Sequence, residues 1–267
     1  PELRTAMLGE TQALLKDLLS GAIGFNGFLT ADYTYVNDAL AEHYGLAKPG
    51  STSLKKVTLP ATSNRRGYIT HGSFLAATSQ PGTTSIVKRG RVVFENLLCG
   101  EVAEPQDGVP QFDTSGGGTL REKFERHRAD PKCRACHEAI DPPGFALETY
   151  NAVGAFRTMD NGGVIDPSGE LVTDGGPVRV KDAIDMAQVI SKDDGYARCV
   201  THALFTFALG RGPDKADGGG DMDEAVLASL EGTLKSSGWK FPDMARAIVA
   251  SKPFRMRRAN LAQGAQP

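Results

Sequence analysis

The sequence predicts a mainly α-helical protein with long loops rich in glycine and proline. Apolar residues recur at helical spacing through most of the 267 residues, whereas residues 100–118 and 158–178 lack this periodicity and are rich in Gly, Pro and Asp. Hydrophobic residues make up 40% of the chain, which is typical of a folded globular protein. The net charge of −2 and the lack of a long basic run argue against a nucleic-acid partner. No apolar stretch approaches the roughly 18 residues that cross a bilayer.

The first half of the chain alternates predicted helices and loops. Residues 1–21 have the apolar spacing of an amphipathic helix, and residues 33–44 also show helical spacing. Residues 48–64 are rich in Pro, Ser, Thr and Gly and predict a loop. Residues 67–77 are apolar, but their pattern does not distinguish a helix from a strand. Residues 87–98 predict a further helix.

A second helical region follows the Gly/Pro-rich linker at residues 100–118. Thr119 and Glu122 have the spacing of a capping box, which predicts that a helix begins here and runs to about Arg128. Residues 158–178 predict loops or a short hairpin. Further helices are expected over residues 180–191, 195–210, 221–236 and 241–251.

A C-x-x-C-H pentapeptide is formed by Cys133, Cys136 and His137. This pattern is typical of covalent attachment of haem c. The two thiols add to the vinyl groups of the haem, and one helical turn sets them at the right separation. His137 then points its imidazole at the iron as the proximal ligand. The sequence therefore predicts a helical c-type haem-binding domain with one covalent haem.

Other roles for the cysteine pair have to be weighed. A thioredoxin-like redox pair needs a βαβ setting, which the sequence does not indicate. A zinc site needs four ligands. His127 could join the two cysteines, but the adjacent Cys136 and His137 cannot easily serve one metal. Zinc or a plain disulfide stays open as the alternative to haem.

The residues after the motif fit a haem pocket. Residues 140–148 (IDPPGFALE) predict a Pro-rich turn leading into a short helix. Ile140, Phe145, Leu147 and Tyr150 are apolar enough to cover a porphyrin face, although for any single one of them a place in the core is the better interpretation.

The motif and its flanks carry a family resemblance. Residues 127–157 (HRADPKCRACHEAIDPPGFALETYNAVGAFR) resemble the haem-bearing segment of a bacterial family catalogued as consecutive domains of unknown function 1592, 1588 and 1585. Residues 3–45 resemble the end of the 1592 domain, and residues 67–98 resemble the 1588 domain that also holds the haem segment. Residues 206–211 (TFALGR), with residues 248–254, resemble the 1585 domain.

The resemblance implies three parts. These are the end of an upstream helical domain over residues 1–66, a haem-binding segment over residues 67–160 and a C-terminal helical domain over residues 161–267. It also implies a secreted or periplasmic multidomain cytochrome with more domains upstream, and it supplies no substrate. The chain starts inside a predicted helix without an initiator Met, so we expect a mature form or a fragment.

The second axial ligand decides the chemistry of such a haem. His and Met ligation suits electron transfer, whereas an open iron face suits peroxide or oxygen chemistry. His71, in a small-residue turn before Gly72, is the first candidate. Met159, in the loop after the haem helix, is the second. The other histidines considered are His43, His127 and His202, and the other methionines are Met7, Met186, Met222, Met244 and Met256.

Three arginines near glycines, Arg89, Arg157 and Arg211, are candidates for charge-assisted contacts to haem propionates, with surface salt bridges as the alternative. Cys99 and Cys199 are isolated in sequence. An exported protein with covalent haem matures in an oxidising compartment, so we expect these two cysteines to form a disulfide.

Residues 217–224 (DGGGDMDE) gather carboxylates that could bind calcium, but they lack EF-hand spacing, and a solvated acidic turn at a helix start is the better interpretation. The function expected from the sequence is electron transfer by a monohaem c-type cytochrome module. Its partner would be the upstream part of the same polypeptide or a redox partner protein. A haem enzyme of peroxidase or oxygenase type, with an open distal iron site, is the alternative.

Overall fold

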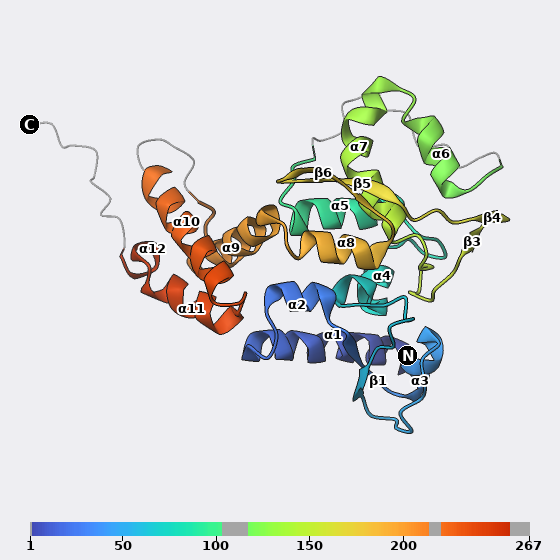
Figure 1. Cartoon of the computed structure of the whole chain (residues 1–267), viewed down its shortest axis with the longest axis horizontal. Coiled ribbons are helices and arrows are strands. Elements are labelled where there is room, and N and C mark those ends of the chain that lie inside the picture. Colours follow the sequence, from blue (N-terminus) through green and yellow to red (C-terminus); the bar gives the residue numbers. More distant parts are fainter. Residues whose placement is uncertain (1, 103–116, 214–219, 257–267) are drawn as a thin grey trace, which may run out of the picture.

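The computed structural model describes residues 2–102, 117–213 and 220–256 and is mainly helical (Figure 1). The helices are α1 (Glu2–Ser20), α2 (Phe25–Thr30), α3 (Asp38–Tyr44), the 3-10 helix η1 (Tyr68–Thr70), α4 (Gly72–Ala77), α5 (Ile86–Leu97), α6 (Leu120–His127), α7 (Pro131–Ala146), α8 (Ala183–Ile190), α9 (Asp194–Leu209), α10 (Gly220–Ser236), α11 (Phe241–Ala250) and α12 (Lys252–Arg255). Among the described helices, none combines the length and the apolar character of a membrane span.

The sheets are small and antiparallel. Each of the three has two strands, pairing β1 (Tyr33–Val36) with β2 (Lys55–Thr58), β3 (Met159–Asp160) with β4 (Gly163–Val164), and β5 (Gly169–Thr173) with β6 (Gly176–Val180). The last two pairs lie in the region that was predicted as loops or a hairpin. β5 packs against α7 and β6 against α8, in the upper part of the view in Figure 1.

Most helices expected from apolar periodicity are present. α1, α5, α9, α10 and α11 begin and end within one residue of their predicted bounds. α6 begins as its sequence predicts, because the Thr119 hydroxyl accepts a hydrogen bond from the backbone N–H of Glu122. The Glu122 carboxylate in turn accepts one from the N–H of Thr119. The mainly helical class is therefore confirmed.

The helical prediction for residues 33–36 is wrong. Tyr33–Val36 is strand β1, paired with a strand inside the stretch predicted as loop. Its alternating aromatic and β-branched side chains favour extended backbone. The helix begins only after Asn37, whose side chain accepts a hydrogen bond from the N–H of Leu40.

The Pro-rich turn predicted after the cysteine pair is also wrong, because α7 continues through Pro142 and Pro143. Each proline removes a backbone donor and costs about 3 kcal/mol in a helix interior. Residues 140–146 are all buried, and they lie where α7 packs against α5. This tertiary packing outweighs the local preference for a turn.

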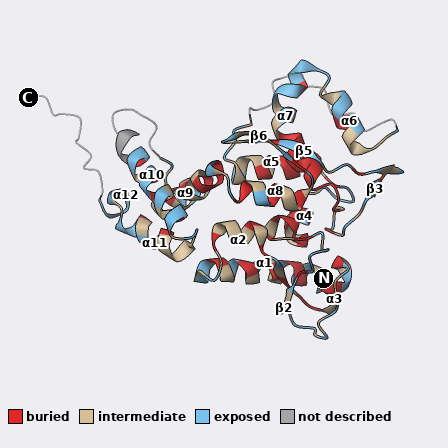
Figure 2. Ribbon diagram, viewed as in Figure 1, coloured by how far each residue is buried: buried red, intermediate tan, exposed pale blue. Residues whose placement is uncertain are grey.

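One hydrophobic core joins segments from the whole length of the chain. Figure 2 shows the buried residues concentrated on α5, α8 and the part of α7 nearest to them. The core includes Leu29 of α2, Leu75 of α4, Val93 of α5 and Met186 of α8. Leu147, directly after α7, is buried in the same cluster. The predicted boundaries near residues 66 and 160 therefore do not separate independent cores.

The crossing of α5 and α7 is unusually close. A Cβ added at Gly90 would lie 1.7 Å from the carbonyl oxygen of Ile140, and one added at Gly144 would lie 2.3 Å from that of Ile86. Real Cβ atoms do not approach so closely, so only glycine fits at these two positions. The two helix backbones are therefore in direct contact.

A fully buried arginine, Arg89, lies next to this crossing. Its guanidinium donates to the carbonyl oxygens of Leu147, Tyr150 and Asn151, after the end of α7. It also donates to Ser79, after the end of α4. The carbonyl oxygens of Leu147 and Asn151 also accept backbone N–H groups, from Tyr150 and Gly154. The Arg89 side chain therefore joins the turn after α7 to α5 and to the segment after α4, and both of its Nη atoms have partners.

The predicted disulfide between Cys99 and Cys199 is confirmed. It joins Cys99, two residues after the end of α5, to α9. The two Cα atoms are 5.2 Å apart, and the residues are 100 positions apart in sequence. Closing a loop of this length stabilises the fold by about 4 kcal/mol in the chain-entropy model. The bond attaches the C-terminal helices to the helix that crosses α7.

The C-terminal helices α9, α10 and α11 enclose a second hydrophobic cluster, which includes Phe205, Leu234 and Met244. Trp239 contacts both clusters and stacks on Tyr196, with ring centroids 5.6 Å apart. The second cluster therefore packs onto the main body through aromatic contacts as well as the disulfide.

Gly90→Ala is expected to lower the free energy of unfolding by about 3 kcal/mol, because the added Cβ would force α5 and α7 apart. The matched control is Gly232→Ala on α10, where a Cβ meets nothing within 4 Å and the higher helix propensity of Ala raises stability by about 1 kcal/mol. Urea unfolding followed by circular dichroism measures both changes. Equal unfolding midpoints for the two variants would contradict the close crossing.

Candidate functional site

The cysteine pair lies in the first half of α7. Asp130 caps this helix by accepting a hydrogen bond from the N–H of Lys132, and Pro131 occupies its first turn, where no backbone donor is needed. Cys133 is buried and Cys136 is half-buried, and both keep their thiols. The pair therefore presents two sulfur atoms one helical turn apart, and it does not form the plain disulfide that the sequence left open.

His137 is held by a buried carboxylate. Its Nδ1 lies 2.8 Å from Oδ1 of Asp141, one turn further along α7, and the Asp141 side chain is fully buried. Oδ2 of Asp141 lies 3.6 Å from Nε of Arg128. Burial raises the pKa of Asp141, whereas its bond to His137 and the charge of Arg128 lower it. With Nδ1 engaged, Nε2 is the ring atom of His137 that remains for a ligand.

The two helices α6 and α7 form a hairpin that brings aromatic rings around His137. The ring of His127 lies 4.8 Å from that of His137, and the ring of Phe124 lies 5.8 Å from it, both measured between centroids. Phe124 also meets Phe145 edge to face. Ile86 completes this small apolar cluster. Burial and the neighbouring His137 lower the pKa of His127, which favours its neutral form.

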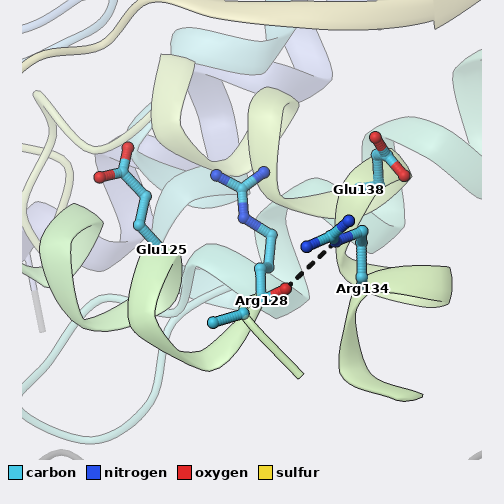
Figure 3. Close-up of a pocket in the computed structure, with 5 residues that line it drawn as sticks. Glu125, Arg128, Arg134 and Glu138 are labelled. Atoms are coloured by element: carbon cyan, nitrogen blue, oxygen red, sulfur yellow. Dashed lines mark hydrogen bonds between the residues drawn. The ribbon is translucent and has the colours of Figure 1, made fainter. Parts of the chain in front are cut away.

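Cationic side chains border the same region. The guanidinium groups of Arg121 and Arg128 lie over the ring of Phe145, 4.1 and 5.7 Å from its centroid. A cavity of about 450 Å³ opens between α6 and α7. Figure 3 shows its lining, where Nε of Arg134 donates to the carbonyl oxygen of Arg128. Arg121, Arg128 and Phe145 also line a neighbouring cavity of about 320 Å³.

His71 lies in a different part of the molecule. Its Nδ1 is 2.9 Å from the hydroxyl of Thr11, and its Nε2 is 3.8 Å from Oε1 of Glu10, both on α1. Burial, with a smaller effect of Arg65, lowers the pKa of His71 to about 3. Among the contacts of the described residues, none joins His71 to His137. Its role as distal ligand stays a prediction without support from proximity.

Glu10 is the centre of the buried network around His71. Its carboxylate accepts hydrogen bonds from the hydroxyls of Thr34, at 2.5 Å, and Tyr44, at 2.6 Å. Burial raises the pKa of Glu10 to about 7, although these two donors and Arg65 lower it. The network joins α1 to β1, α3 and the start of α4, so its evident role is structural.

Met159, the alternative distal ligand, lies on β3 with half of its surface exposed. The strand lies beside the start of α6, because the neighbouring Asp160 accepts a hydrogen bond from the N–H of Leu120. No contact between Met159 and His137 occurs within the described ranges. This ligand assignment also stays a prediction.

The two arginines predicted to contact propionates have protein partners. Arg89 is the buried side chain described at the helix crossing, within α5 rather than in a turn. Arg157 forms ion pairs with Glu148 and Asp160. Burial raises the pKa of Glu148 to about 7 despite the opposing charge of Arg157. Propionate contacts by Arg89 and Arg157 stay predictions. In the structure, both side chains form hydrogen bonds or ion pairs that stabilise the fold.

The acidic stretch at residues 217–224 lies partly outside the described residues. Of its carboxylates, Asp223 is buried and forms an ion pair with Arg211, with 2.7 Å between Oδ2 and Nη1. Over residues 2–102, 117–213 and 220–256, no group of three or more His, Cys, Asp and Glu side chains is arranged to hold a metal ion.

The sequence prediction missed Asp141. The signal that could have found it is its position four residues after His137, which places both on one face of a helix. That spacing was hidden by the predicted turn at Pro142. Arg128 and Arg121 were missed as well, because both reach the site only through the folding of the α6–α7 hairpin.

The fold and the site define a mainly helical, disulfide-bonded protein with a C-x-x-C-H turn on a helix whose second half is buried. Three family models match successive parts of it: a protein of unknown function (DUF1592) over residues 1–46, a protein of unknown function (DUF1588) over residues 65–160 and a protein of unknown function (DUF1585) over residues 178–254. The chain therefore combines these three domains of unknown function, as its sequence resemblance indicates. No curated protein and no solved structure matches it.

Glu10→Gln is expected to flatten the pH dependence of stability. A carboxyl whose pKa rises on folding from 4.5 to about 7 binds more protons in the folded state. Its contribution is therefore fully present below pH 4.5 and is lost as the pH rises through 7. As the pH rises from 4.5 to 7, Glu10 alone should lower the free energy of unfolding of the wild type by about 1 kcal/mol per pH unit.

Urea unfolding at a series of pH values measures this slope. The matched control is Glu42→Gln, which changes an exposed carboxylate on α3 and should leave the slope as in the wild type. An unchanged slope in Glu10→Gln would show that Glu10 does not titrate in this range.

Proposed function

We propose that this protein is a monohaem c-type cytochrome module that transfers electrons within a larger redox protein. The observation that carries the proposal is the first half of α7. There, two thiols one turn apart precede an imidazole whose Nδ1 is engaged by the buried Asp141. Covalent attachment of haem c needs this donor set in this order.

The residues around the motif fit a haem. Cys133 and Cys136 would hold it covalently, and Nε2 of His137 would be the proximal iron ligand. Phe124, Phe145 and the buried Ile140 supply apolar surface next to the motif. When bound, the haem supplies a one-electron ferric–ferrous couple.

Asp141 prepares His137 for this role. A carboxylate that accepts the Nδ1 proton fixes the tautomer and the orientation of the ring, and it makes Nε2 a more basic donor. Because Asp141 is fully buried, solvent screens this interaction only weakly. The carboxylate is therefore expected to favour the ferric state and to lower the reduction potential.

The cationic border suits the propionates of a haem. Arg121 and Arg128 lie over Phe145, close to the motif and at the edge of the cavities. Arginine binds carboxylates through charge-assisted hydrogen bonds. Arg121 and Arg128 are better candidates for propionate contacts than Arg89 and Arg157. The guanidinium of Arg89 binds backbone carbonyls, and that of Arg157 binds Glu148.

The compartment and the partner follow from the same proposal. The Cys99–Cys199 disulfide supports an oxidising location, such as the periplasm or the outside of the cell. The electron would pass to the rest of a longer polypeptide or to a separate redox partner protein.

A haem enzyme is the second candidate, and the Asp141–His137 pair favours it. An electron-rich proximal ligand suits peroxide or oxygen chemistry at an open distal face. The spectrum of the purified protein separates the two functions. A low-spin oxidised spectrum supports the carrier, whereas a high-spin spectrum that shifts on addition of peroxide or cyanide supports the enzyme.

Protein exported together with a c-type maturation system is expected to carry one covalently bound haem. Cys133→Ala and Cys136→Ala should each lose one thioether, and the double variant should lose covalent haem entirely. Arg134→Ala changes the same helical turn without removing a thiol and is the control. Haem staining after denaturing electrophoresis and the visible spectrum measure attachment, and absence of haem from correctly exported wild type would overturn the proposed function.

Asp141→Asn is expected to raise the reduction potential by about 60 mV, which corresponds to a tenfold change in the one-electron equilibrium constant. The amide oxygen can still accept the Nδ1 proton, so the ring stays in place while the negative charge is lost. Redox titration followed in the visible spectrum measures the shift. Glu138→Gln, which changes an exposed carboxylate three residues away, is the control, and equal potentials in the two variants would exclude the role given to Asp141.

A further inference from the structure

His127 is the histidine that the fold places against the proximal histidine. The ring centroids of His127 and His137 are 4.8 Å apart, with the ring planes at 81°. The two residues come from different helices, so their proximity results from the α6–α7 hairpin and not from sequence spacing. Figure 1 shows this hairpin projecting from the body of the molecule.

Several of the other candidate ligands have contacts elsewhere in the fold. His71 is buried against Thr11 and Glu10, and Nε2 of His43 lies 2.8 Å from the carbonyl oxygen of Val153. Met159 is half-exposed on β3. Met7, Met186 and Met244 are buried in hydrophobic clusters.

The backbone of His127 is tied to the start of α7. Its carbonyl oxygen accepts a hydrogen bond from the N–H of Asp130, at 3.3 Å, and the Asp130 side chain caps α7. The connection between the two helices is therefore one tight turn. At the other end of α6, Phe124 is anchored against Ile86 and Phe145. These contacts keep the His127 ring beside the first two turns of α7.

We propose that His127 is the second axial ligand of the haem held by Cys133, Cys136 and His137. This inference rests on the proposed function. Metal–imidazole bonds are about 2 Å long, so two imidazoles on opposite sides of one metal have centroids roughly 6 Å apart. The observed 4.8 Å is short of this by about 1 Å, a distance that the tip of a two-helix hairpin can supply while Phe124 stays anchored.

Two histidine ligands determine what the site does. An iron with both axial positions filled is low-spin and does not admit oxygen, peroxide or carbon monoxide without losing a ligand. Ligation by both His127 and His137 would therefore favour electron transfer over reaction with oxygen or peroxide.

The test compares four holoproteins of the full chain: wild type, His127→Ala, His127→Met and His71→Gln. Visible, near-infrared and electron paramagnetic resonance spectra of the oxidised forms report the spin state and the ligands. Carbon monoxide added to the reduced forms reports an open position. Wild type and His71→Gln should be low-spin, without the near-infrared band of methionine ligation, and should not bind carbon monoxide.

His127→Ala should become high-spin and bind carbon monoxide, and added imidazole should restore its low-spin spectrum. His127→Met should gain the near-infrared methionine band, a gain of signal that does not depend on the stability of the Ala variant. A low-spin spectrum that persists in both His127 variants without that band, or a high-spin wild type, would overturn the assignment while leaving the covalent haem intact. Absence of haem from the wild type would instead overturn the proposed function itself.

Discussion

The direct contact between the backbones of α5 and α7 is the constraint on which the rest of the structure depends. It requires glycine at residues 90 and 144, on opposite sides of the crossing, and it lies next to Arg89, which donates to the carbonyl oxygens of Leu147 and Tyr150 after the end of α7. The second half of α7 is thereby clamped in the core. The first half, which carries Cys133 and His137, extends from this clamp toward α6. Precise positioning of the candidate haem ligands requires that the helix carrying them be held rigidly, and the buried second half of α7 meets this requirement.

The sequence predicted the elements whose apolar periodicity agrees with the tertiary packing. α1, α5 and the C-terminal helices lie where their periodicity placed them. The errors occur where a long-range contact overrides a local signal. Pro142 and Pro143 signal a turn, but the burial of their neighbours against α5 keeps them in a helix. Strand β1 needs its partner β2, and no local pattern shows that residues 55–58 will supply it.

For the candidate site, sequence reasoning reached the residues that lie within one pentapeptide and little beyond it. Cys133, Cys136 and His137 are adjacent in sequence, so the motif alone identifies them. Asp141 is four positions away and was concealed by the wrong turn. His127 was considered only as one histidine among several, because its distance from His137 is set by the packing of two helices. His71 was predicted as a ligand from its small-residue turn in an apolar segment. The same local pattern is equally compatible with the buried structural network around Glu10, which is where His71 lies.

The shared hydrophobic core also bears on how such chains are inherited. Leu29 lies in the segment matched by DUF1592, Val93 in that matched by DUF1588 and Met186 in that matched by DUF1585, yet all three are buried in one cluster. A recombination event that exchanged one segment for an unrelated sequence would expose apolar surface on the other two. Selection would remove such a product before any new activity could be tried. In this chain, the three matched segments are therefore parts of one folding unit, and each depends on the other two for the burial of its apolar side chains.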